Sequence, residues 1–176
     1  VSVALDYWWS QLVPDEVKND TRMIALSGNV CVDKKPSELN RKLGRGFWVT
    51  AQVELSDELL QKTFKISSQT LLEAHHAKNE VGCKVAGTPA QNMHVANAVA
   101  AVLLATGQDP AHVVDVASAA SIDFVEVKNG VKVVLEMPTI PVGSIGGGTS
   151  LPQQHELLQL ALGEETTSSK LAAVVS

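Results

Sequence analysis

The sequence feature that most restricts the fold is an Asn-Gly pair between two apolar runs. Asn129-Gly130 separates residues 122–127 from residues 131–136, and both runs are rich in β-branched side chains. Asn-Gly favours the tight turn whose twist matches that of two antiparallel strands. The chain is therefore predicted to form a β-hairpin here, which commits part of it to an antiparallel sheet.

Two further strands are predicted upstream of the hairpin. Phe47, Val49, Ala51 and Val53 alternate with more polar residues, which is the period of a half-buried strand. The apolar run over residues 23–32 predicts a buried strand that ends at a charged turn, Asp33-Lys34-Lys35-Pro36.

Helical patterns fill most of the remaining chain. They are predicted over residues 3–12 before Pro14, 56–75, 92–106 with Gly107 as the C-terminal cap, 153–162 with Gly163 as the stop, and from residue 171 onward. The segment 92–106 is dense in alanine, so we expect it to lie close to another backbone. Helices and strands of this kind indicate an α+β fold.

Composition excludes several classes of protein. The 176 residues suit one ordinary domain, with 45% hydrophobic and 19% charged residues. The net charge of −5 and the lack of a basic run argue against nucleic acid as the main partner. The apolar stretches are too short for a membrane segment, and no leader pattern opens the chain. Cys31 and Cys83 lack metal-binding spacing, so we expect reduced thiols.

The charged turn Asp33-Lys34-Lys35-Pro36 is the first candidate for chemistry. Adjacent lysines are common on solvated surfaces, and most such triplets have no function. Here they follow an apolar run and precede a proline that restricts the backbone. A lysine placed in this way could neutralise an oxyanion as its charge develops.

Polar residues near the alanine-rich segment form two more candidates. His94 and Asn97 are three residues apart, so they share one helix face, either as a simple surface pair or as a pair aimed at a ligand. Asp109 precedes Pro110, which is typical of a helix N-cap, and a capped aspartate is also held rigidly enough for catalysis.

The loop 143–149 contains four glycines but has neither the phosphate-loop ending nor the dinucleotide fingerprint. Its glycines would let the backbone approach a flat or anionic ligand, or would simply permit a tight turn. We expect no metal site, because no His/Cys/Glu set has the spacing of structural zinc ligands.

Taken in chain order, the motifs resemble one family. They are Ser27-Gly28-Asn29-Val30-Cys31-Val32-Asp33-Lys34-Lys35-Pro36, Gly44-Arg45-Gly46, Lys78-Asn79-Glu80-Val81-Gly82, His94-Val95-Ala96-Asn97, Gly107-Gln108-Asp109, Met137-Pro138-Thr139-Ile140, and Gly146-Gly147-Gly148-Thr149 through Pro152-Gln153-Gln154. This series resembles the catalytic region of 3-hydroxy-3-methylglutaryl-coenzyme A (HMG-CoA) reductases, and its Asp-Lys-Lys form is similar to that of eukaryotes and archaea. The ordered series is specific, whereas no single motif is.

The resemblance implies a role for each matching residue. Lys34 would be the catalytic lysine that stabilises the oxyanion, and Asp109 the aspartate that holds and tunes it. The residues implied to bind the HMG moiety or line its site are Ser27, Asn29, Asp33, Lys35, Lys78, His94 and Asn97. Those implied to lie near the nicotinamide cofactor are Ile145, Gly146, Gly147, Gly148 and Thr149.

The family activity implied is reduction of HMG-CoA to mevalonate and CoA with two NADPH, a step toward isoprenoids and sterols. The resemblance also implies a homodimer or tetramer with the active site between subunits. It implies a location in the cytoplasm, or on the cytosolic face of the endoplasmic reticulum if an anchor precedes the chain. Residues 1–26 would be the end of the small cofactor domain, and residues 27–176 part of the large HMG-CoA-binding domain.

We expect this chain to be incomplete relative to the family. The family's catalytic glutamate and its Gly-Asp-Ala-Met-Gly-Met-Asn-Met run would lie before Val1, and the histidine that protonates the CoA thiolate would lie beyond Ser176. We therefore expect weak turnover from the chain alone. The alternative is a non-catalytic homologue that serves as a folding, dimerisation or CoA-ligand-binding module.

Overall fold

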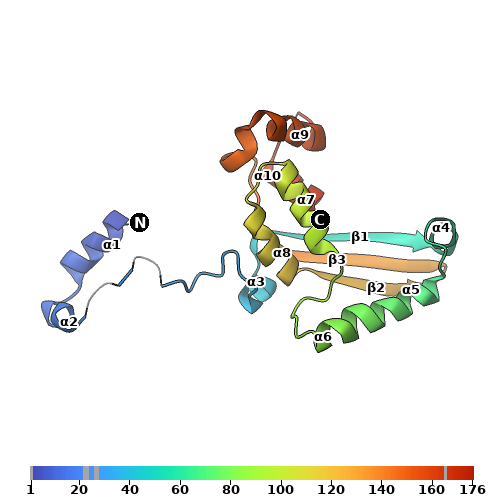
Figure 1. The fold of residues 1–176 in the computed structure, drawn as a ribbon, viewed down its shortest axis with the longest axis horizontal. Coiled ribbons are helices and arrows are strands. Elements are labelled where there is room, and N and C mark those ends of the chain that lie inside the picture. The colour runs from blue at the N-terminus through green and yellow to red at the C-terminus, as the bar shows by residue number, and fades with distance from the viewer. Residues whose placement is uncertain (1, 22–23, 26–27, 165) are drawn as a thin grey trace. The chain divides into compact units, whose positions relative to one another are not determined.

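The computed structural model describes residues 2–21, 24–25, 28–164 and 166–176. It divides the chain into two compact units, Val1–Cys31 and Val32–Ser176. In the first unit, α1 (Ser2–Tyr7) continues into a π-helical turn, η1 (Trp8–Leu12), and α2 (Asp15–Asp20) follows Pro14 (Figure 1). The helix predicted over residues 3–12 is confirmed. Proline ends it because proline cannot donate the next backbone hydrogen bond.

The buried strand predicted over residues 23–32 is wrong for the residues that are described. Ile24 and Val30 are 88% and 87% exposed, and no strand is assigned to the described part of this run. An apolar run becomes a strand only where another strand satisfies its backbone groups, and the described residues here have no such partner. Met23 lies outside the described residues.

The second unit contains a three-stranded antiparallel sheet. Its strands are β1 (Arg45–Ser56), β2 (Ser121–Val127) and β3 (Gly130–Ile140), in the order β1-β3-β2 (Figure 1). Val127 pairs with Gly130 across the turn, so the predicted hairpin is confirmed. The predicted strand at Phe47–Val53 is also confirmed, and it pairs with β3.

The helix predicted over residues 56–75 is two helices. Ser56 caps α4 (Asp57–Thr63) by accepting a hydrogen bond from the Leu59 amide, and Ser67 caps α5 (Ser68–His75) in the same way. Lys65 between them has a φ of +61°, which a continuous helix does not allow. The second serine cap was the signal in the sequence that this break would occur.

The remaining helices of the second unit are α3 (Glu38–Leu43), η2 (His76–Gly82), α6 (Cys83–Val85), α7 (Val95–Ala105), η3 (Pro110–His112), α8 (Val113–Ala119), η4 (Gly147–Ser150), α9 (Pro152–Leu162) and α10 (Ser168–Val175). The sequence predicted α7, α9 and α10 and a helix start at Asp109, whereas α3, η2, α6 and η4 were not predicted. Helix α5 packs beside β2, whereas α7, α8 and α10 gather around the other end of the sheet (Figure 1). The α+β class is therefore confirmed.

One core lies where α7, α8 and α10 meet the sheet. Val99 and Leu103 of α7 are buried against Val116 of α8 and against Met137 and Ile140 of β3. Burial of each such large side chain stabilises the fold by roughly 1.5–3 kcal/mol. The core fixes α7 and α8 on the sheet, and the polar turn that joins these two helices carries Asp109.

Within the described ranges, no helix combines the length and the apolar character needed to cross a membrane.

Candidate functional site

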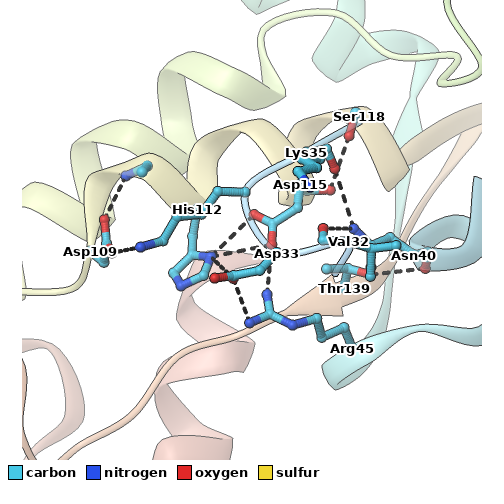
Figure 2. A network of polar contacts seen from close by, with 12 residues as sticks. Val32, Asp33, Lys35, Asn40, Arg45, Asp109, His112, Asp115, Ser118 and Thr139 are labelled. Carbon is cyan, nitrogen blue, oxygen red and sulfur yellow. Dashed lines mark hydrogen bonds and ion pairs between the residues drawn. The ribbon is translucent and has the colours of Figure 1, made fainter. Parts of the chain in front are cut away.

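The turn that carries Lys34 is held by a buried asparagine. Asn40 of α3 is 1% exposed, and its side-chain amide donates to the carbonyl oxygens of Val32, at 2.9 Å, and Lys35, at 3.4 Å (Figure 2). The backbone carbonyl oxygen of Asn40 accepts a hydrogen bond from the hydroxyl of Thr139 in β3 at 2.9 Å. Lys34 itself has a φ of +54°, a conformation that costs a non-glycine residue energy. The packed surroundings therefore determine this turn.

Lys34 and Asp109 form the central ion pair of the site. Lys34 Nζ lies 2.6 Å from Asp109 Oδ2, and the two side chains are 41% and 45% exposed. Asp109 also caps η3, since its Oδ1 accepts from the Ala111 amide at 2.9 Å. Both roles that the sequence suggested for Asp109, helix cap and partner of Lys34, are therefore present in one side chain.

The contact shifts the pKa of both groups in the direction that favours charge. The hydrogen bond to Asp109, together with its negative charge, raises the pKa of Lys34 above the ordinary 10.5. The hydrogen bond from Lys34 and that from the Ala111 amide lower the pKa of Asp109 below the ordinary 3.8. At neutral pH, Lys34 is a cation and Asp109 is an anion.

A second ion-pair network lies beside the first. Arg45, at the start of β1, contacts Asp33 Oδ1 at 2.7 Å through one guanidinium nitrogen and Asp115 Oδ2 at 2.8 Å through another (Figure 2). Asp115 of α8 is fully buried, and His112 Nδ1 lies 3.2 Å from its Oδ2. Two charge-assisted contacts from one guanidinium fix its orientation.

Asp33, His112 and Asp115 are grouped closely enough to resemble a metal site. Their ligand atoms lie within 4.8 Å of one another, which is close enough for a metal ion. The guanidinium of Arg45, however, contacts both carboxylates directly. An arginine therefore already supplies the positive charge that these carboxylates need.

Of the residues in this network, the sequence predicted only Asp33 as a site residue. Arg45 entered only as part of a Gly-Arg-Gly motif, and Asn40, His112 and Asp115 were not singled out. Arg45 and Asp115 are 70 positions apart, so no local pattern joins them. The glycines on both sides of Arg45 were the only signal that its backbone position is special.

The glycine loop is attached to the same turn that carries Asp109. The Gln108 side chain donates to the Gly143 carbonyl at 2.8 Å and accepts from the Gly143 amide at 2.9 Å. The Gly148 amide donates to the Gly107 carbonyl at 3.0 Å. A Cβ on Gly107, whose φ is +69°, would lie 2.4 Å from the Gly148 carbonyl carbon. Only glycine permits this approach, so Gly107-Gln108-Asp109 joins the loop to the ion pair.

The side chains of the loop differ sharply in exposure. Ile145 is 93% exposed, whereas Thr149 is buried and its hydroxyl donates to the Gly146 carbonyl at 2.6 Å. Gly146 has a φ of +95°, and a Cβ there would meet no atom within 4 Å. The loop therefore presents an open stretch of backbone next to the Asp109 turn. Its role in cofactor binding stays a prediction.

His94 and Asn97 form the local pair that the sequence suggested. Asn97 Nδ2 lies 3.4 Å from His94 Nδ1, and both residues are exposed. His94 is the N-cap residue of α7, with a φ of +64°, so it precedes the helix and the prediction that it lies on the helix face is wrong. A residue in the left-handed conformation cannot be part of a right-handed helix, so α7 begins only after His94. Contact with a ligand stays a prediction for both residues.

One predicted substrate residue, Lys78, is not brought to the ion pair by any described contact. Lys78 is exposed on η2, and among the described contacts no hydrogen bond or ion pair joins it to the Lys34 turn. Asn29 belongs to the first unit, and Ser27 lies outside the described residues. The structure divides the chain after Cys31, and the predicted domain boundary after residue 26 stays a prediction. The roles of the two domains stay predictions.

Comparison with known proteins agrees on one family. The family model described as hydroxymethylglutaryl-coenzyme A reductase matches residues 7–176. The chain is 39% identical over 149 residues to a 3-hydroxy-3-methylglutaryl-coenzyme A reductase of Aeropyrum pernix, covering 84% of this chain and 35% of that protein. Its identity to the reductase of Halobacterium salinarum is 41% over 152 residues, 86% of this chain and 36% of the relative.

A fungal relative has similar identity over a longer alignment. The 3-hydroxy-3-methylglutaryl-coenzyme A reductase of Fusarium fujikuroi is 38% identical over 162 residues, which are 91% of this chain and 16% of the fungal protein. The chain thus spans about a third of the length of the two archaeal relatives and less of the fungal one.

Proposed function

The chain belongs to the hydroxymethylglutaryl-coenzyme A reductase family, and from this premise we propose that it serves in the reduction of HMG-CoA to mevalonate and CoA. NADPH is the reductant that we propose, with two molecules consumed for each thioester reduced. Because the chain covers about a third of its archaeal relatives, binding of HMG-CoA is the first property to test, and turnover is the second.

The observation that supports this proposal best is the half-exposed ammonium of Lys34 against Asp109. Hydride addition to a thioester carbonyl places negative charge on its oxygen. A fixed cation next to that oxygen stabilises the transition state and needs no reorganisation as the charge develops. Lys34 has the required charge at neutral pH, and Asp109 restricts its position at 2.6 Å. In this role Lys34 stays protonated and acts as an electrostatic catalyst.

The neighbouring residues supply the substrate-binding part of the proposal. Lys35 follows Lys34 on the same turn, and we assign it to the terminal carboxylate of the HMG moiety. Asp33, Lys78, His94 and Asn97, with Ser27 and Asn29, complete the proposed substrate set. The site is proposed to be complete only in a homodimer or tetramer, in which a second copy faces the Lys34 turn.

The glycine loop is the part of this chain that suits a cofactor. The nicotinamide would supply hydride to the thioester carbonyl. Gly146 leaves open the space that a Cβ would fill, and Ile145 exposes an apolar side chain beside it. A flat ring can approach such a backbone closely. Through Gln108 and Gly107 this loop is fixed to the turn that carries Asp109.

Calorimetry with HMG-CoA tests the binding step. We expect binding by the chain, a loss of about tenfold or more in Lys35→Ala, because a hydrogen bond to a charged group contributes about 1.5–3 kcal/mol, and no loss in Lys42→Ala. Lys42 is the matched control, since it is an exposed lysine on α3 whose nearest acid is Glu38 at 4.0 Å. Equal affinity of wild type and Lys35→Ala would contradict the substrate assignment.

Loss of absorbance at the nicotinamide band tests turnover. Where turnover is measurable, Lys34→Ala should lower it about 100- to 1,000-fold, the usual effect of removing one oxyanion-stabilising group. Binding of HMG-CoA without any turnover would favour the binding-module alternative. Normal rates in Lys34→Ala would remove Lys34 from its role.

A further inference from the structure

Arg45 is placed by two close approaches of its neighbours to β3. Gly44 has a φ of +70°, and a Cβ there would lie 2.6 Å from the Pro138 carbonyl oxygen. Gly46 has a φ of +76°, and its Cβ would lie 2.5 Å from the Ile140 carbonyl oxygen. Both positions require glycine, because a side chain would collide with backbone that belongs to the central strand. The Cα of Arg45 is therefore fixed against the sheet.

From this fixed position the guanidinium joins the Lys34 turn to α8. One nitrogen contacts Asp33, the residue directly before Lys34, and the other contacts Asp115, which is fully buried. A buried carboxylate needs such a partner, since an unpaired charge in the interior is strongly unfavourable. The Asp33–Arg45–Asp115 contact is thus anchored at one end in the core.

The Lys34–Asp109 pair connects the same two segments. Asp109 caps η3, which continues directly into α8, the helix of Asp115. Asp33 and Lys34 are neighbours on one turn, so two ion-pair links join that turn to the segment 109–115. A long lysine side chain has many rotamers, and a second link nearby restricts the backbone from which it extends.

We propose that Arg45 is a positioning residue for Lys34: by tying Asp33 to Asp115, it holds the turn so that the Lys34 ammonium stays against Asp109. The catalytic meaning of this arrangement rests on the function proposed above. The positioning itself is a property of the free chain and can be measured without substrate or cofactor.

The direction in which the pKa of Lys34 changes when Arg45 is removed separates positioning from simple charge repulsion. Arg45 is a cation near Lys34, and its charge by itself lowers the pKa of Lys34. Removal of Arg45 with unchanged geometry would therefore raise the pKa of Lys34. If Arg45 holds the turn, its removal loosens the contact with Asp109, and the pKa of Lys34 falls toward the ordinary lysine value.

The experiment is an NMR titration of the chain with isotope-labelled lysine, the Lys34 signal being assigned from Lys34→Arg. We expect a lower Lys34 pKa in Arg45→Gln than in wild type, and partial recovery in Arg45→Lys, which keeps the charge but not the two-armed contact. Arg41→Gln is the matched control, since Arg41 pairs with Glu38 on α3. A pKa that rises or stays unchanged in Arg45→Gln, or that falls equally in Arg41→Gln, would overturn the proposal.

A double variant keeps the test valid if Arg45→Gln does not fold. Arg45→Gln with Asp115→Asn removes both charges of the buried contact, so no unpaired carboxylate is left in the core. The proposal requires a lowered Lys34 pKa in this folded double variant, and a wild-type value there would refute it. Calorimetry with HMG-CoA on wild type is run in parallel. Absence of binding there would count against the proposed function, whereas the titration would still decide the role of Arg45.

Discussion

Lys34 Nζ and Asp109 Oδ2 lie 2.6 Å apart, although one residue belongs to the turn before α3 and the other to the turn after α7. Three separate contacts make this possible. Asn40 holds the first turn, the Gln108 side chain and Gly107 hold the second against the glycine loop, and Arg45 bridges the two segments. Each of these contacts leads to a prediction that can be tested on the chain itself.

Asp109→Asn should change the pH dependence of stability in a defined way. The pKa of Lys34 is raised, so its contribution is present below pH 10.5 and is lost as pH rises through the raised value. The pKa of Asp109 is lowered, so its contribution is present above pH 3.8 and is lost as pH falls through the lowered value. The stability difference between wild type and Asp109→Asn should be constant near neutrality and shrink at both extremes.

Urea unfolding at a series of pH values measures this difference. Glu126→Gln, which replaces an exposed carboxylate on β2, serves as the control, and its stability should stay close to that of wild type at every pH. A wild-type advantage that instead changes steeply between pH 6 and pH 8, roughly the range in which histidine titrates, would show that another group dominates.

Arg45→Met should destabilise the fold because it leaves the buried carboxylate of Asp115 without its guanidinium partner. We expect a loss of about 3 kcal/mol in the free energy of unfolding, at the lower end of the usual range, because Arg45 is one-third exposed and His112 also contacts Asp115. Adding Asp115→Leu should recover most of that loss. Denaturant titration measures both, with Arg41→Met as the control, and no recovery in the double variant would contradict the explanation.

Gly107→Ala should be more damaging than Gly87→Ala. Both glycines have a φ near +70°, so alanine at either position costs about 1–2 kcal/mol for its left-handed backbone. A Cβ at Gly107 would also lie 2.4 Å from Gly148, whereas at Gly87 it would meet nothing within 4 Å. The excess loss of Gly107→Ala in thermal or urea unfolding therefore isolates the contact with the glycine loop. Equal losses would show that the loop yields without cost.

Asn40→Asp should weaken the Lys34 turn without changing the size of the side chain. Aspartate cannot donate the two hydrogen bonds to Val32 and Lys35, and it places a carboxylate at a site that is 1% exposed. The expected cost is about 1–3 kcal/mol of unfolding free energy, with weaker binding of HMG-CoA. Asn19→Asp on α2, at an exposed position, is the control and should be close to neutral. An unaffected Asn40→Asp variant would mean that the turn is held by its other contacts.

Several local elements of this protein were determined by the sequence alone. The Asn129-Gly130 pair marks the hairpin: Lys128 and Asn129 form its turn, and Gly130, with a φ of +152°, begins β3 where a Cβ would collide with the Leu55 carbonyl oxygen. Alternation around Val49 specifies β1. Caps at Ser56 and Asp109 begin their helices because each side chain satisfies an amide nearby in the sequence. The ordered motifs also predicted the family and the pairing of Lys34 with Asp109.

Only the tertiary structure decided what lies around that pair. The Asp33–Arg45–Asp115 network joins residues from three separate elements, and Arg45 and Asp115 are 70 positions apart. Local propensity cannot specify such a contact, because its energy arises only when burial removes water from Asp115. The same reason explains the failed strand over residues 23–32, where apolar character was present but no described strand satisfied the backbone.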